Sequence, residues 1–242
     1  MLWSFCSSKG GVGTSVVAAA FAAELASSSG NQVVLVDFCG AQPDMCGLDT
    51  RGAPGVVDWL LSSSDVGVDA IENLFIDVSP GIVLLPQGTR PLPSVAGQVD
   101  PERIGKLISA LVEMEAVADV GVIDLDPLSP RALLIAGSTR TVTIVRSCYL
   151  ALRQLSRLPI VVDVLVEVLE GGRSLRTIDI EAVAGVAVQA KLRVDPAIAR
   201  SVDAGRIVQR PPRALRRLAR DVRSADTARI ADTGPTVAGV GQ

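Results

Sequence analysis

The sequence predicts an α/β fold in which a doubly wound, mostly parallel sheet carries helices on both faces. Hydrophobic residues make up 48 % of the 242 residues and aromatic residues 3 %, so the core consists of Val, Leu, Ile and Ala, as in a buried parallel sheet. Two short apolar runs end in carboxylates, at Asp37 and Asp124. A glycine-rich loop joins the first apolar run to an Ala-rich segment of helical length, which is typical of the opening of such a fold.

Strands and helices are expected to alternate along the chain. Apolar runs predict strands at residues 2–6, 33–37, 82–85, 120–124, 141–145, 161–168 and 186–190. Length and apolar spacing predict helices at 15–26, 56–61, 103–115, 149–157, 178–184, 196–204 and 213–223. Residues 38–54, rich in Gly, Pro, Asp and Cys, predict a functional loop. We expect one domain over residues 1–223 and a disordered tail over 224–242.

Composition excludes several classes of function. The chain has four cysteines without a CxxC pair, and it has no histidine, which excludes a Cys₂His₂ zinc site and a Ser-His-Asp triad. The formal net charge of −3 argues against nucleic-acid binding by the whole surface but allows a local basic face. The apolar N-terminus lacks the basic residues of a signal peptide, and no apolar run has the length of a membrane span. We therefore expect a cytoplasmic protein with free thiols.

The glycine-rich loop predicts a phosphate-binding site. Glycines let the backbone curl around an anion, and the N-terminus of the following helix adds a favourable dipole. A serine hydroxyl at the start of that helix is suited to binding Mg²⁺. The residues predicted to bind the phosphates are Lys9, Gly10, Gly11, Val12, Gly13, Thr14 and Ser15.

Two aspartates support this interpretation. Asp37 and Asp124 each end a predicted buried strand. At the carboxyl edge of a parallel sheet they would face the same crevice as the loop. A buried carboxylate without a partner is costly, so we predict that Ser15, Asp37 and Asp124 hold a metal ion.

The loop resembles the deviant Walker A box of the ParA/MinD family, written KGGxGK followed by Ser or Thr. Residues 33–37 resemble the strand before switch I of that family, residues 122–124 resemble its Walker B motif, and residues 82–88 resemble its LLPAG segment. Residues 194–205, which include Pro196, are similar to a late segment beside the adenine. The resemblance covers nearly the whole chain, from residue 1 to about 223.

This resemblance implies a P-loop NTPase that binds ATP and Mg²⁺. It implies catalytic roles for Lys9, Asp37 and Asp124 and contact of Pro196 with the base. It also implies a nucleotide-dependent homodimer, in which Lys9 reaches the nucleotide of the partner subunit.

Three departures from the family pattern affect the expected activity. Thr14 stands where the family has the Walker lysine, and loss of that charge-assisted contact costs about 1.5–3 kcal/mol. Cys39 stands where switch I has a second aspartate, and a thiol does not replace that carboxylate near neutral pH, although Asp44 lies further along the loop. Asp126 adds a carboxylate after Asp124. We therefore expect ATP binding with slow or no hydrolysis.

The sequence also bears on the subgroup within this family and on two alternative functions. The form KGGVGTS is similar to the CpaE/TadZ group associated with Tad pilus assembly, and residues 147–153 resemble septum-site-determining-like proteins. A first alternative is a plasmid or chromosome partition ATPase that binds DNA non-specifically. A second is a scaffold indifferent to nucleotide. Membrane binding is not expected, because the basic helix lacks Trp and Phe. The arginines that would bind DNA are Arg206, Arg210, Arg213, Arg216, Arg217, Arg220 and Arg223.

Overall fold

A computed structural model describes residues 1–63 and 65–232 of the chain. Within these residues, eight strands form one sheet in the order β3-β4-β2-β5-β1-β6-β7-β8. Neighbouring strands run parallel, except that β3 pairs antiparallel with β4. The strands are β1 (Leu2–Ser7), β2 (Val33–Asp37), β3 (Ile76–Ser79), β4 (Ile82–Leu85), β5 (Glu115–Val122), β6 (Arg140–Arg146), β7 (Val164–Leu169) and β8 (Val188–Arg193).

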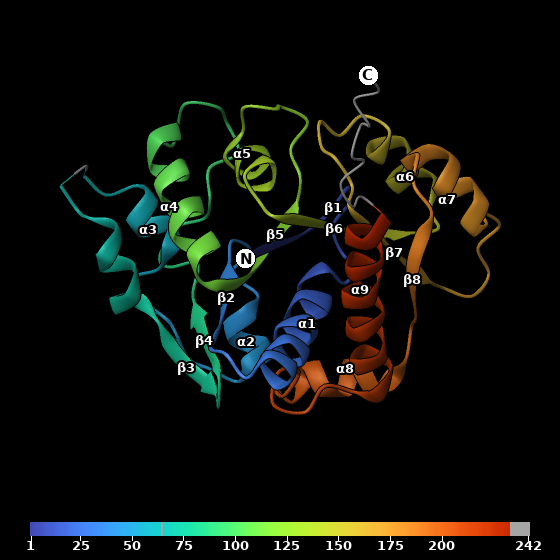
Figure 1. Cartoon of the computed structure of the whole chain (residues 1–242), viewed down its shortest axis with the longest axis horizontal. Helices are drawn as coiled ribbons and strands as arrows, with labels where there is room; N and C mark the ends of the chain where they lie inside the picture. The colour runs from blue at the N-terminus through green and yellow to red at the C-terminus, as the bar shows by residue number, and fades with distance from the viewer. Residues whose placement is uncertain (64, 233–242) are drawn as a thin grey trace, which may run out of the picture.

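Helices cover both faces of this sheet (Figure 1). One side carries α1 (Thr14–Ser29), α2 (Gln42–Cys46), α8 (Pro196–Asp203) and α9 (Arg213–Asp232). The other side carries α3 (Val56–Leu60), the 3₁₀ helix η1 (Val68–Leu74), α4 (Pro101–Glu113), α5 (Pro130–Ala136), α6 (Tyr149–Leu155) and α7 (Thr177–Ala184). The α/β class, with a mostly parallel sheet and helices on both faces, is thus confirmed.

Helix α1 packs on the sheet, and α9 lies beside it on the same face, over β7 and β8 (Figure 1). Phe21 of α1 packs against the rings of Trp3 and Phe5 on β1, with ring centroids 4.8 and 5.1 Å apart. Leu215 and Leu218 of α9 join the same buried cluster. Aromatic burial of this kind contributes strongly to core stability. The loop that precedes α1 therefore starts from a rigid strand and ends on a rigid helix.

Two boundaries differ from those expected. Helix α9 continues to Asp232, so residues 224–232 of the expected tail are helical, and residues 233–242 lie outside the described residues. Strand β5 runs from Glu115 to Val122, whereas the sequence placed a strand at 120–124. The ladder with β1 shifts register between Phe5 and Cys6, which face Asp119 and Gly121, and Gly121 has a φ of +75°, so the strand contains a bulge near its end.

Helix α2, inside the loop expected at 38–54, touches the segment between α8 and α9. A Cβ added to Gly47 would lie 2.9 Å from the carbonyl oxygen of Gly205. The Ile207 amide donates to the carbonyl of Met45 at 3.3 Å, and Gln209 Nε2 donates to the carbonyl of Cys46 at 3.0 Å. Such a close approach of two backbones requires glycine. The loop after β2 is therefore fastened to the C-terminal part of the chain.

No helix among the described residues is long and apolar enough to span a membrane.

Candidate phosphate-binding site

The glycine loop joins the end of β1 to the start of α1, at the carboxyl edge of the sheet. Gly11 has a φ of +75°, and Gly13, the N-cap of α1, has a φ of +98°. Residues with a Cβ are strained in this region of φ. The first turn of α1 contains no carboxylate, so the positive end of the helix dipole is not neutralised there. The strand, the glycine turn and the helix thus follow one another as the sequence predicts, and phosphate binding by this loop stays a prediction.

The predicted loop residues occupy different environments. Lys9, Gly10 and Gly11 are exposed, whereas Val12 is buried and Thr14 is 7 % exposed. Ser8 is buried and donates its hydroxyl to the carbonyl oxygen of Ala151 at 2.8 Å, which attaches the loop to α6. The exposed part of the loop is thus the part that carries Lys9.

Asp37 ends β2 and binds the backbone of the following loop. Its Oδ1 accepts the amides of Cys39 and Gly40, each at 2.8 Å, and its Oδ2 accepts the amide of Gln42 at 3.0 Å. The side chain is fully buried. Asp37 therefore sets the shape of the loop after β2 in addition to placing negative charge beside the glycine loop.

Asp119, on β5, lies directly opposite Asp37 in the β2–β5 ladder and is also fully buried. Its Oδ2 accepts Gln42 Nε2 at 2.8 Å, and the nearby Ser15 side chain partly offsets the rise that burial causes in the pKa of Asp119. The same Gln42 Nε2 lies 3.0 Å from the carbonyl oxygen of Ser15. A carboxylate pair therefore lies next to the hydroxyl that the sequence assigns to a metal ion.

The two buried carboxylates affect each other's ionisation. Burial, followed by the charge of Asp119, raises the pKa of Asp37 to about 6. Burial also raises the pKa of Asp119. Two neighbouring carboxylates in a low-dielectric site are costly when both are ionised. A divalent cation with oxygen ligands would relieve that cost, so Asp37, Asp119 and Ser15 fit a magnesium ion chemically.

The structure does not bring Asp124 to this carboxylate pair. Asp124 follows the end of β5 and is partly buried, and its Oδ2 lies 3.7 Å from Nη1 of Arg131. The group of possible metal ligands among the described residues is instead Asp37, Cys39 and Asp119, whose ligand atoms lie within 4.8 Å of one another. Sequence reasoning missed Asp119 because it lies inside an apolar run. Gly121, two residues later, was the available signal of a bulge within the strand.

Cys39 lies against Asp119. Its Sγ is 3.5 Å from the carbonyl oxygen and 3.6 Å from Oδ1 of Asp119. Burial, and then the charges of Asp119 and Asp37, raises the pKa of the thiol. A Cβ on Gly121 would overlap this Sγ. Cys39 is an exposed residue whose neutral thiol contacts Asp119, at the position that the family resemblance assigns to an aspartate.

The two other acidic candidates lie outside the carboxylate pair. Asp126 is exposed, and its Oδ1 accepts the amide of Leu128 at 2.9 Å, which stabilises a turn. Asp44 lies in α2 and lines a cavity of about 1020 Å³ between α2 and the loop after β4. That cavity includes no residue of the glycine loop, so its size does not make it the phosphate site.

A smaller cavity, of about 300 Å³, opens beside the glycine loop. The loop and α1 contribute Val12, Gly13 and Val16, while α8 and the ends of β7 and β8 contribute mainly apolar side chains. Pro196 is exposed and begins α8; the cavity is lined by its neighbours Val194, Asp195 and Ile198. An apolar cavity beside a phosphate loop is suited to a flat organic ring such as a base.

One basic residue touches the loop from outside it. Arg146 ends β6, and its Nη2 donates to the carbonyl oxygen of Gly11 at 2.9 Å. Arg146 also lines the cavity of about 300 Å³. The sequence pattern did not single it out, because it lies 135 residues away from Gly11 along the chain.

Solved structures share this architecture. A ParA family ATPase from Chlorobium tepidum TLS superposes with a TM-score of 0.71 at 22 % identity, covering 93 % of this chain and 98 % of the other. The septum site-determining protein MinD complexed with Mg-ADP, from Pyrococcus horikoshii OT3, gives 0.69 at 17 % identity, covering 96 % and 97 %. A putative plasmid partition protein from Borrelia burgdorferi B31, bound to AMPPNP, gives 0.69 at 14 % identity, covering 94 % and 98 %.

Neither a protein-family model nor a curated protein sequence matches this chain significantly. The similarity therefore lies in the three-dimensional arrangement. At sequence identities of 14 to 22 %, these superpositions establish the fold alone. The strand order, the glycine loop before α1 and these superpositions lead to one conclusion: the chain has the P-loop NTPase fold of the MinD and ParA ATPases.

Proposed function

We propose that this chain binds ATP with Mg²⁺ at the glycine loop and acts as a nucleotide-dependent switch of the ParA/MinD type. The observation that carries the proposal is the pair of buried aspartates Asp37 and Asp119 at the base of the loop, where Gln42 Nε2 donates both to Asp119 Oδ2 and to the carbonyl oxygen of Ser15. Oxygen ligands of this kind suit Mg²⁺. The Mg-ADP and AMPPNP complexes of the similar folds support the same ligands.

In this proposal Ser15 and Asp119 hold the metal ion, and Asp37 supports it through the loop after β2. Asp119 thus replaces Asp124 in the metal-binding role expected from the sequence. When bound, Mg²⁺ neutralises phosphate charge. The cavity of about 300 Å³ next to Pro196 receives the base.

Hydrolysis is expected to be slow or absent. Thr14 offers a neutral hydroxyl where a lysine would touch the β- and γ-phosphates. Cys39 is a neutral thiol packed on Asp119, so it does not orient an attacking water as a carboxylate would. The nucleotide then acts mainly by occupying the site.

We further propose that nucleotide binding brings two copies together over the loop. The rim of the site carries large apolar side chains that are exposed, which is typical of interaction surfaces. Lys9, on the exposed part of the loop, would supply positive charge to the nucleotide of the partner subunit. The exposed apolar residues are Val122, Leu125, Leu128, Tyr149 and Leu150.

Light scattering after gel filtration tests this switch, with Mg²⁺ and no nucleotide, ADP or ATP. We expect ATP to double the mass of the wild type, the Lys9→Ala variant to stay monomeric, and the Lys106→Ala variant to behave as wild type. Lys106 is a matched control because it is an exposed lysine on α4, paired with Glu102 at 2.9 Å. A mass indifferent to nucleotide in all three proteins contradicts the proposal and favours the scaffold alternative.

The cargo is proposed from the loop pattern. The form KGGVGTS supports a role in positioning a cellular structure, of the Tad pilus or septum-site type, in the cytoplasm. ATP-dependent dimers that do not bind DNA would agree with this role.

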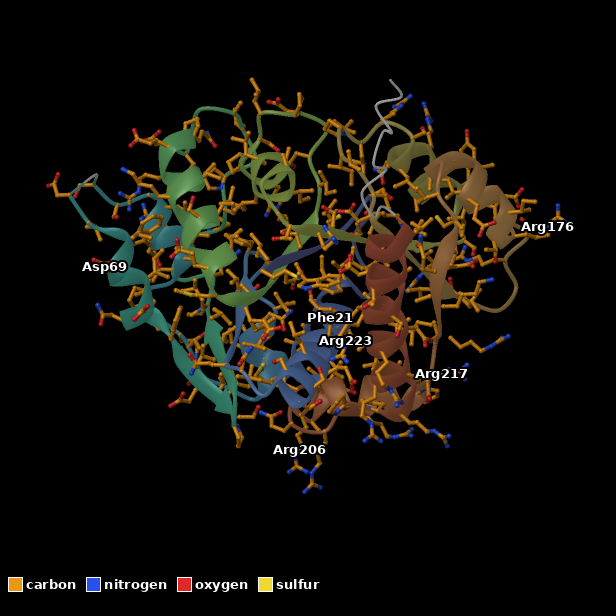
Figure 2. The ribbon with its side chains drawn as sticks, in the orientation of Figure 1. Phe21, Asp69, Arg176, Arg206, Arg217 and Arg223 are labelled. Carbon is orange, nitrogen blue, oxygen red and sulfur yellow. The ribbon has the colours of Figure 1, made fainter. Side chains whose placement is uncertain are left out.

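DNA partition is a second candidate, favoured by the arginines at the C-terminal end of the fold. Arg206 and Arg217 point outward from the lower part of the molecule in Figure 2. Arg217 lies 3.9 Å from Asp221, and both side chains are well exposed, so this ion pair is weak and leaves the guanidinium available to a phosphate. The exposed arginines of this surface are Arg206, Arg210, Arg213, Arg216, Arg217 and Arg220.

Salt-dependent binding to duplex DNA distinguishes this candidate. Each phosphate contact contributes about −0.9 to the slope of log K against log salt. An Arg216→Ala/Arg220→Ala double variant should lower the magnitude of that slope by about 2 if partition is the function. An Arg51→Ala/Arg176→Ala double variant removes the same charge elsewhere and should leave the slope unchanged. Absence of a salt-sensitive shift in the wild type contradicts the partition candidate.

A further inference from the structure

The glycine loop carries little positive charge for a site that binds a triphosphate. Lys9 is the one cation among residues 8–15, and it is exposed at the outer part of the loop. Thr14, the first residue of α1, is uncharged and 7 % exposed. A β- or γ-phosphate near Thr14 would therefore find backbone amides and the helix dipole, but no cation from the loop itself.

Arg146 lies where such a cation is needed. Strand β6 pairs with β1, with Ile144 opposite Ser7, the residue after which the loop begins. Arg146, two residues further, donates from Nη2 to the carbonyl oxygen of Gly11 at 2.9 Å. It also contributes to the cavity that Val12 and Gly13 line.

Within the described part of the chain, only some of the N–H donors of the Arg146 guanidinium have hydrogen-bond acceptors. It has five N–H donors, and one of them binds Gly11. Nε is buried and has no hydrogen-bond partner among the described residues. Nη1 lies 3.8 Å from Oε2 of Glu170, which is beyond hydrogen-bond distance. Donors therefore remain for an incoming anion.

Glu170 is shared between two guanidinium groups. Arg173 donates to Glu170 Oε2 from Nε at 2.8 Å and from Nη2 at 2.5 Å. Arg173, Arg146 and Lys9 together lower the pKa of Glu170. One carboxylate thus faces three cations, which leaves an excess of positive charge beside the loop. A partly exposed pair at 3.8 Å is weak, so a phosphate group can displace it.

We propose that Arg146 supplies, from its own subunit, the phosphate-facing cation that Thr14 does not, and that Glu170 restrains it until the anion binds. An arginine fits this role because its planar fork binds two phosphate oxygens at once. Loss of the Walker lysine is then compensated by a residue of β6. The inference rests on the proposed nucleotide function and concerns the β- and γ-phosphates of the same ligand.

Titration calorimetry with Mg-ATP, ADP and AMP tests the assignment. We expect Arg146→Ala to weaken ATP binding by about 10- to 100-fold and AMP binding by less than about threefold. Arg176→Ala is the matched control, because Arg176 is exposed at the edge of the molecule, as Figure 2 shows, and should bind as wild type. Glu170→Gln should strengthen ATP binding, because it releases Arg146.

A double variant shows whether weaker ATP binding by Arg146→Ala comes from the lost charge or from a loss of folding. Thr14→Lys should strengthen ATP binding, and Arg146→Ala should then cost less than about threefold in that background, because the lysine supplies the charge. Equal ATP affinity of the Arg146→Ala and Arg176→Ala variants overturns the role of Arg146 and leaves the proposed function intact. A wild type that does not bind ATP overturns both.

Discussion

The two sides of the glycine loop differ in how many of their polar groups already have hydrogen-bond partners. On the carboxylate side, Asp37 accepts three backbone amides, and Asp119 accepts the Gln42 side chain. On the arginine side, Arg146 makes one hydrogen bond to the loop and one long ion pair with Glu170. The first side is assembled when the chain folds, whereas the second keeps donors available. In the function proposed above, the first side holds the metal ion and the second binds the phosphates.

The largest expected effect tests which aspartate belongs to the carboxylate side. Asp119→Asn should weaken Mg²⁺-dependent ATP binding by tenfold or more, because a charge-assisted contact is worth about 1.5–3 kcal/mol. Asp124→Asn should leave binding within about threefold of the wild type, less than one such contact is worth. Calorimetry with and without Mg²⁺ measures both. A larger loss for Asp124→Asn would restore the assignment made from the sequence.

The Gly121→Ala variant tests how rigidly Cys39 is held against Asp119 on the carboxylate side. Gly121→Ala combines the strain of a positive φ, about 1–2 kcal/mol, with overlap against Cys39 Sγ, which adds about 1–3 kcal/mol. Gly30→Ala shares the positive φ but meets no atom within 4 Å, so it should cost about 1–2 kcal/mol. Urea denaturation gives both free energies of unfolding. Equal costs would mean that Cys39 is free to move aside.

The buried charges of Asp37 and Asp119 should also make the free energy of unfolding depend on pH. The pKa of Asp37 is raised from 3.8 to about 6, so the folded state holds its proton more tightly than the unfolded state. The contribution of Asp37 to stability is therefore complete below pH 3.8, falls as the pH rises, and is lost above about pH 6.

Asp119→Asn removes the neighbouring charge and should recover part of that loss. At neutral pH without nucleotide, the variant should be more stable than the wild type by about 0.5–2 kcal/mol, and the gain should disappear at pH values below about 4. Chemical denaturation across pH 3.5–7.5 measures the difference. A gain that is constant over this range would show that charge is not its cause.

The smallest effect is expected at Asp126. Its side chain is exposed and accepts one amide in a turn, so Asp126→Asn should change stability by less than about 0.5 kcal/mol and leave ATP affinity unchanged. Thermal denaturation and calorimetry check both. A marked loss of ATP affinity would extend the carboxylate side beyond the Asp37–Asp119 pair.

The comparison also explains which parts could be predicted from the sequence. The glycine loop and Asp37 were found because each follows directly on a buried strand, so the signal is local. Asp119 was missed because it sits within an apolar run, and its position depends on the pairing of β5 with β2 and on the register shift between Phe5 and Cys6 in the β1–β5 ladder. Arg146 depends on the pairing of β6 with β1. Contacts of this kind arise from topology, and no single sequence window contains them.

The end of helix α9 was misjudged for a different reason. The polar composition after Ser224 favours disorder, yet the buried Asp226 forms an ion pair with Arg140 of β6. A long-range contact therefore outweighs local propensity there.

The contact of Gly47 with Gly205 gives the molecule a mechanical link. Asp37 shapes the loop that leads into α2, and α2 meets the segment before α9 backbone to backbone. The hydrogen bonds that the carbonyls of Met45 and Cys46 accept from Ile207 and Gln209 join the two segments further. The loop after β2 and the arginine-bearing segment that begins at Arg206 are therefore held in direct backbone contact, so a change in the position of one is expected to affect the other.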